Sequence, residues 1–144
     1  MKNPYRDISA AILRFASDFA SQHGLTALNL DAHADPESWP EGDFIGPSDV
    51  MIDFREGEIK VTLAFVVSTR SDTNLHRMDE IVNNLINELE LGSRILVRDA
   101  VLGTPKGFLI THMGIRAGSV LNTETQPAKP VFVNLISDLA LLRS

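Results

Sequence analysis

The strongest constraint on the fold is a run of alternating apolar and polar residues between positions 50 and 67, divided in two by the dipeptide Glu56-Gly57. A period of two places successive side chains on opposite faces of an extended strand. A glycine in such a dipeptide readily adopts the conformation that a tight turn needs. The segment therefore predicts a hairpin with one apolar and one polar face. Its polar face is expected to carry Asp53, Arg55, Lys60 and Thr62.

Two amphipathic helices are predicted to cover the apolar face of this hairpin. In the first, apolar residues recur at helical spacing between Pro4, which suits the first helical position after an Asn3 cap, and Gly24, a natural C-cap. In the second, apolar residues recur at helical spacing from Leu75 to Leu89, and Gly92 is expected to end the helix. Its start has three suitable caps that the sequence does not rank: Ser71, Asp72 and Thr73.

Further strands are expected on both sides of these helices. A short strand is predicted at 25–30, and two more at 94–102 and 107–118, joined by a tight turn that uses Pro105 and Gly107. The last strand is predicted at 131–142, although the spacing of its leucines also allows a helix there. Since this strand is apolar on both faces, it should be central in the sheet or covered by another subunit.

The order of these elements predicts an α+β fold with two layers, an antiparallel sheet and two helices packed on one face. Residues 1–144 are expected to form a single domain, because a chain of this length supports one hydrophobic core.

Composition excludes several classes of function. A net charge of -6 lacks the basic footprint of proteins that recognise nucleic acid sequences, and the absence of cysteine excludes disulfides, thiolate nucleophiles and zinc sites with sulfur ligands. No long apolar run predicts a membrane segment, and the N-terminal pattern lacks the features of a signal peptide, so a cytoplasmic protein is expected.

One cluster could carry metal or acid-base chemistry. Asp31, His33 and Asp35 alternate along a short extended segment, so their side chains could share one face. Glu37 and Asp43 could add oxygen ligands from the loop that follows. The alternative is a solvated polar strand end. We favour this second interpretation, and no metal, cofactor or catalytic residue is predicted, because the sequence also lacks phosphate-binding, nucleophile-elbow and zinc-protease motifs.

The loop predicted at 35–48 is long for a compact domain, and such loops are often functional. It contains Trp39 and Phe44, and an exposed aromatic side chain is a common anchor at protein interfaces. The alternative is that both rings fold back and cover the core.

The segments "DVMIDFREGEIKVTLAFVVS" and "GSVLNTETQPAKPVFVNLISDLAL", within the predicted order of helices and strands, resemble the tail terminator (minor tail protein) family of long-tailed bacteriophages and prophages. The resemblance implies a structural virion protein and not an enzyme. Such subunits form a hexameric ring that ends polymerisation of the tail tube and joins the tail to the head connector. The implied partners are further copies of the chain, the tail-tube protein and a connector or neck protein. The implied locations are the host cytoplasm during assembly and the virion tail.

Three polar segments are the expected contact regions of such a subunit: 35–48, 68–74 and 122–129, with Trp39, Phe44, Asp72 and Asn122 as candidate interaction residues. Two other functions remain open. One is a different neck or head-completion protein of a phage. The other is a small metal-dependent enzyme that uses Asp31, His33 and Asp35.

Overall fold

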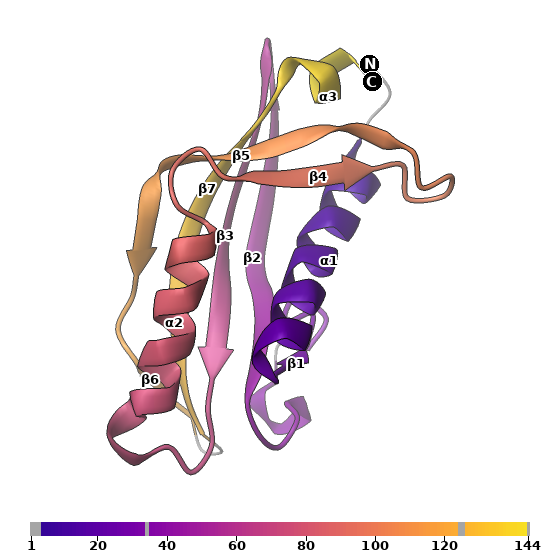
Figure 1. Cartoon of the computed structure of the whole chain (residues 1–144). Helices are drawn as coiled ribbons and strands as arrows, with labels where there is room; N and C mark the ends of the chain where they lie inside the picture. The colour runs from indigo at the N-terminus through magenta and orange to yellow at the C-terminus, as the bar shows by residue number, and fades with distance from the viewer. Residues whose placement is uncertain (1–3, 34, 124–125, 144) are drawn as a thin grey trace.

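The computed structural model describes residues 4–33, 35–123 and 126–143, so the predicted cap Asn3 lies outside the described residues. The fold is α+β, as predicted (Figure 1). The helices are α1 (Tyr5–His23), α2 (His76–Glu88) and α3 (Leu139–Arg143), with single 3-10 turns η1 (Pro36–Ser38) and η2 (Thr73–Leu75). The strands are β1 (Thr26–Ala27), β2 (Phe44–Arg55), β3 (Glu58–Ser68), β4 (Arg94–Arg98), β5 (Pro105–Ala117), β6 (Leu121–Asn122) and β7 (Pro127–Ser137).

The strands form one sheet in the order β1-β2-β3-β7-β5-β4, with β6 beside β7. The sheet is mixed, because β1 runs parallel to β2 whereas the other pairs are antiparallel. The chain continues beside β2 after β1, since the Leu28 and Leu30 amides donate to the carbonyls of Ile45 and Pro47 at 3.0 and 3.1 Å. The prediction of a wholly antiparallel sheet missed this parallel edge.

The predicted hairpin and the first helix stop are confirmed. Arg55 pairs with Glu58 across the Glu56-Gly57 turn. Gly24 has a φ of 69°, and its amide closes the end of α1 on the carbonyl of Ala20. A left-handed φ of this kind is available to glycine without steric cost.

The last strand is central, as predicted, because β7 lies between β3 and β5. The prediction that it continues to residue 142 is wrong. It ends at Ser137, and the Asp138 carboxylate accepts the amide of Leu141 at 2.9 Å at the start of α3. An aspartate that binds an otherwise unpaired amide in this way favours a helix start.

The turn between β4 and β5 also differs from the prediction, since Pro105 and Gly107 belong to β5. The chain reverses earlier, where the Asp99 carboxylate accepts the amides of Val101 and Leu102 at 2.9 and 2.8 Å. An aspartate commonly stabilises a turn through its own side chain. Gly107 is instead needed for packing: a Cβ there would lie 2.5 Å from the Leu141 nitrogen of α3.

The long loop is shorter than predicted, because β2 begins at Phe44 rather than after residue 48. Gly46 and Pro47 lie within the strand and pair with β3. A side chain at Gly46 would collide with the Leu28 carbonyl, so this glycine permits close approach of the neighbouring segment and does not break the strand.

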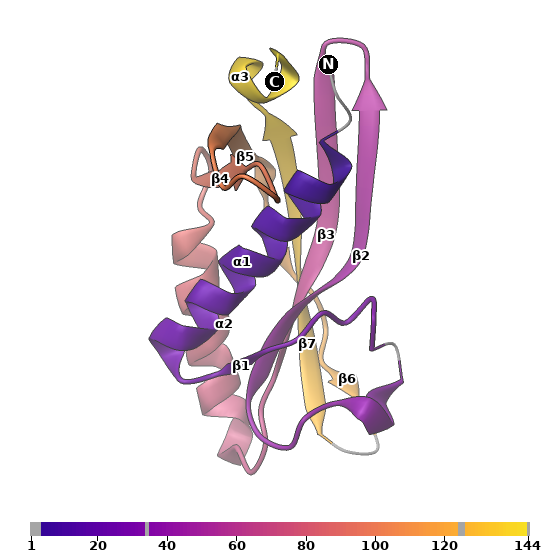
Figure 2. The ribbon, with the colours of Figure 1, turned by 90° about the vertical axis from the view of Figure 1, so that its right-hand side faces the viewer.

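Helices α1 and α2 lie on the same side of β2, β3 and β7 (Figure 2). The main core fills the space between them. It contains Ile8, Ile12, Phe19, Val61, Phe65, Met78, Ile81, Leu85, Val131, Val133 and Leu135, all at most 1% exposed. Alternate side chains of β3 and β7 point to the opposite side, which we call the outer face. None of the described helices is long and apolar enough to cross a membrane.

Candidate functional site

The three segments singled out from the sequence meet at one end of the molecule, at the lower end of Figure 2. The Gln126 amide joins them. It donates to the carbonyl of Gly42 at 2.8 Å and to the hydroxyl of Ser68 at 2.7 Å. Gln126 is only 6% exposed. We call the region formed by the described parts of 35–43, 68–74 and 122–127 the end surface.

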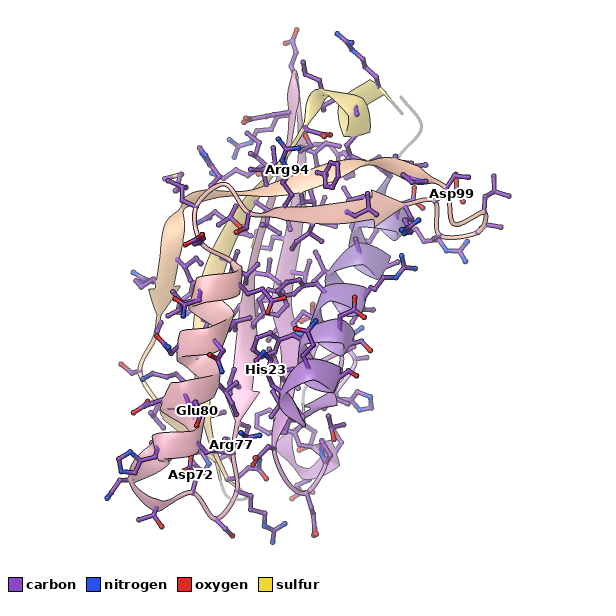
Figure 3. The ribbon with its side chains drawn as sticks, viewed as in Figure 1. His23, Asp72, Arg77, Glu80, Arg94 and Asp99 are labelled. Carbon is purple, nitrogen blue, oxygen red and sulfur yellow. The ribbon has the colours of Figure 1, made fainter. Side chains whose placement is uncertain are left out.

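A second set of contacts fixes the same region from the helix side. The Asp43 carboxylate accepts the backbone amide of Arg70 at 3.1 Å and the Nε of Arg77 at 3.2 Å. Arg77 also donates to the carbonyl of His23 at 2.8 Å, at the end of α1 (Figure 3). The Arg77 side chain is 40% exposed, so the ion pair itself adds little stability. Its contribution is to fix the position of the loop before β2.

The N-cap residue of α2 is Leu75 and none of the three candidates from the sequence, but the Asp72 carboxylate binds amides of the first turn of this helix. This carboxylate accepts the amides of Arg77 and Met78 at 2.9 and 2.8 Å and the hydroxyl of Thr69 at 2.9 Å. Burial raises the pKa of Asp72, but hydrogen bonds from Arg77, Met78 and Thr69 outweigh burial and hold its pKa below the usual value. The carboxylate of this predicted interaction residue is thus engaged within the chain.

The backbone around Asp72 is strained. Ser71, Asn74 and Leu75 have positive φ values of 55°, 54° and 58°. Such a conformation is unfavourable for a bulky residue such as leucine, and it persists only where surrounding contacts enforce it. Strained backbone of this kind is often found at functional sites. The end surface therefore has strained backbone as well as a polar composition.

Trp39 and Phe44 fold back, as in the second of the two interpretations of the aromatic loop. Phe44 is fully buried in a small cluster on the outer face, which also contains Leu30, Val66 and Ala128. The Trp39 ring packs edge-on against Phe44 at 5.2 Å between centroids, and its indole nitrogen donates to the carbonyl of His33 at 2.9 Å. Trp39 keeps part of its surface exposed. Asn122, the fourth candidate, is exposed in β6, opposite Pro127.

The residues proposed for metal chemistry have separate structural roles. The Asp31 carboxylate accepts the amides of Asp49 and Val50 at 2.7 and 3.2 Å, and Asp35 accepts the amide of Glu37 at 3.0 Å. Within 4–33, 35–123 and 126–143, no group of three or more histidine, aspartate or glutamate residues is arranged to hold a metal ion.

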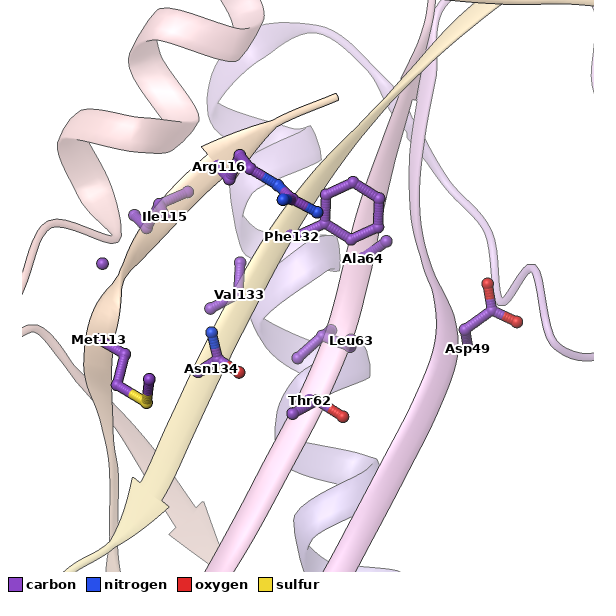
Figure 4. A pocket seen from close by; sticks show the side chains of 11 residues that line it. Asp49, Thr62, Leu63, Ala64, Met113, Ile115, Arg116, Phe132, Val133 and Asn134 are labelled. Atoms are coloured by element: carbon purple, nitrogen blue, oxygen red, sulfur yellow. The ribbon is translucent and has the colours of Figure 1, made fainter. Parts of the chain in front are cut away.

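A hollow of about 510 Å³ opens on the outer face, between β2 and the bulged part of β5 (Figure 4). The ribbon of α1 lies behind the strands in this view. The Arg116 guanidinium lies 5.1 Å from the ring centroid of Phe132, and the rim includes Met113, which is 70% exposed. Met51 on β2 is 68% exposed on the same face. Sequence reasoning missed this hollow, because it depends on a bulge at Met113 and Gly114.

No family model matches the sequence, and no curated protein matches it.

Proposed function

We propose that this protein is a structural subunit of a phage or prophage tail, of the tail terminator type, which assembles into a homo-hexameric ring. In this role it ends polymerisation of the tail tube and joins the tail to the head connector. The observation that carries the proposal is the end surface: three segments far apart in the sequence are tied into one unit by Gln126 and Asp43.

Preorganisation of the end surface supports a contact role. Binding loses less conformational entropy when the contacting loops are already ordered, so more of the contact energy appears as affinity. The amide of Gln126 and the carboxylate of Asp43 both bind atoms of neighbouring segments, so each segment is held by the others. A subunit that terminates a tube needs such a rigid surface at one end, because the tube presents a fixed ring of binding sites.

A two-layer arrangement, with the helices on one side of the sheet, also supports the proposal. Such an arrangement leaves the outer face of the sheet available for contact with another molecule. Met51 and Met113, both largely exposed, are of the residue type enriched at protein interfaces. A ring further requires two different patches on each subunit, so that contacts close by rotation.

The partners in this proposal are the tail-tube protein at the end surface, neighbouring copies at the sides, and a connector or neck protein on the ring. The protein would act in the host cytoplasm during assembly and remain in the virion tail. A different neck or head-completion protein would use the same features with other partners. Binding to the tail-tube protein would indicate a tail terminator, whereas binding to the head connector alone would indicate a neck or head-completion protein.

The test is binding of the purified protein to preformed tail tubes, followed by cosedimentation and by light scattering of the free protein. We expect binding limited to tube ends and a ring of six copies at high protein concentration or on the tube. Arg70→Glu changes an exposed side chain of the end surface and should weaken tube binding. Arg55→Glu, near the hairpin turn at the other end, is the matched control. A protein that stays monomeric and binds no tube contradicts the proposal.

A further inference from the structure

A hollow of about 270 Å³ lies between α1 and β4, and its charged lining is mostly basic. Arg14 from α1 and Arg94 and Arg98 from β4 line it, together with a single carboxylate, Asp18. Its apolar lining includes Phe15, which is partly buried against the main core. An apolar lining surrounded by guanidinium groups suits an amphipathic segment with carboxylates at its edge.

The three arginines of the hollow form no close ion pair in the part of the chain that the structure describes. In the described ranges, none of them takes part in an ion pair within 4.0 Å. The Arg94 guanidinium lies 5.5 Å from the ring centroid of Phe108, and Arg98 donates to the carbonyl of Gly103 at 3.1 Å. Both contacts hold the side chains in place and leave their positive charge available for an anionic partner.

The complementary charge lies on α2 of the same chain. Its exposed surface and the turn that follows it carry four carboxylates: Asp79, Glu80, Glu88 and Glu90. Asp79 has one distant ion pair, with Lys129 at 4.0 Å. Arg77, the arginine of this helix, is bound to Asp43, so apart from the contact of Asp79 with Lys129 the acidic surface has no ion pair among the described residues.

The two patches involve different helices, α1 for the basic hollow and α2 for the acidic surface. Helix α2 is at the left of Figure 1 and α1 at the right, and Figure 2 shows α1 in front of α2. One copy can therefore present its acidic helix to one neighbour and its basic hollow to another. Contacts between two different patches are heterologous, and they close into a ring when the rotation between subunits allows it.

We propose that the basic hollow between α1 and β4 receives the acidic surface of α2 from a second copy of this chain. This contact specifies how copies would associate in the proposed function, and the expectation that they close into a ring rests on that function. Opposite charges on the two patches speed association and favour one relative orientation of the copies. Salt weakens this attraction, because charges are screened over about 8 Å at physiological ionic strength.

The test uses charge reversal with a built-in rescue. Arg14→Glu combined with Arg94→Glu makes the hollow acidic, and Glu80→Arg combined with Glu88→Arg makes the helix surface basic. Each pair alone should lower the association constant about tenfold or more, in keeping with the cost of like charges at an interface. Association should return in an equal mixture of the two variants and in one chain that carries all four changes. Arg55→Glu is the control for added negative charge.

Light scattering over a concentration series at low and at physiological salt measures the association, and circular dichroism verifies that each variant is folded. Folded variants that associate like the original chain overturn the proposal, as does an absence of rescue. Self-association that stays absent for the original chain up to high concentration also overturns it. If an added acidic peptide binds the hollow while the chain stays monomeric, the occupant is another protein.

The outcome is separable from that of the proposed function. Association that depends on both patches, without binding to tail tubes, retains this contact and rejects the tail role. Binding to tube ends that the charge reversals leave unchanged retains the tail role and rejects this contact.

Discussion

The Nζ of Lys106 lies 2.7 Å from a carboxylate oxygen of Asp7, so an ion pair joins β5 to the first turn of α1 across 99 positions of sequence. The other oxygen of Asp7 accepts the amide of Ala100 at 2.8 Å. Both side chains are largely buried, at 11% and 18% exposure. This contact fixes α1 against the β4–β5 hairpin, and it therefore also positions the two walls of the basic hollow.

Replacement of Asp7 should destabilise the fold more than replacement of an exposed carboxylate. In Asp7→Asn the Lys106 ammonium loses its closest partner while it remains largely buried, and a charge in that position is unfavourable. We expect a clear fall in the midpoint of thermal unfolding. Asp53→Asn, whose pair with Arg55 is exposed, should leave the midpoint nearly unchanged. Equal midpoints for both variants would contradict a stabilising role of the Asp7–Lys106 pair.

Gln126 should be the most sensitive single residue of the end surface. Gln126→Ala removes both hydrogen bonds that tie Gly42 and Ser68 together, and at about 0.5–1.5 kcal/mol for each bond we expect a loss of about 1–3 kcal/mol in the free energy of unfolding. Urea unfolding measures this loss. Hydrogen exchange at the amide of Arg70 should also quicken, since its acceptor Asp43 follows Gly42 in the loop. Gln22→Ala, at an exposed site of α1, is the control, and an equal effect there would argue against the bridging role.

A side chain at Gly107 should displace α3. In Gly107→Ala the new methyl group would lie 2.5 Å from the nitrogen of Leu141 and 2.6 Å from the Asp138 carboxylate. Relief of this overlap requires movement of backbone, and we expect a loss of about 1–3 kcal/mol in the free energy of unfolding. Thr104→Ala, at an exposed position just before β5, should be close to neutral. If Gly107→Ala is equally neutral, α3 does not pack on β5 as described.

Acid should weaken the fold through two turn-stabilising carboxylates. Hydrogen bonds from the amides of Leu102 and Val101 lower the pKa of Asp99, and burial opposes them to a smaller extent. Burial raises the pKa of Asp72, but the hydrogen bonds to its carboxylate together outweigh burial and lower that pKa as well. A folded-state pKa below the unfolded value of about 3.9 means that the stability is present above that value. It is lost as the pH falls through the folded-state pKa. Asp72→Asn should therefore flatten the pH dependence of stability below about pH 4, measured by denaturant unfolding.

The sequence predicted the elements that local chemistry determines. The Glu56-Gly57 turn and the Gly24 stop follow from glycine conformations that single residues encode, and the α+β class follows from periodicity. The parallel edge at β1, the early end of β7 and the strand position of Gly107 depend on contacts between distant segments, so periodicity could not predict them. For the candidate site, the sequence indicated the three polar segments, but not that the buried Gln126 joins them.

The most direct test of the central claim is the length of tail tubes that polymerise from the cognate tail-tube protein in the presence of this chain, measured in electron micrographs over time. A terminator should bind the growing end, so tubes should stop at shorter lengths as the protein concentration rises and carry a ring-shaped cap. The Arg70→Glu variant should need a higher concentration for the same effect. Tubes that grow at the same rate to the same length, without caps at any concentration, would contradict the account.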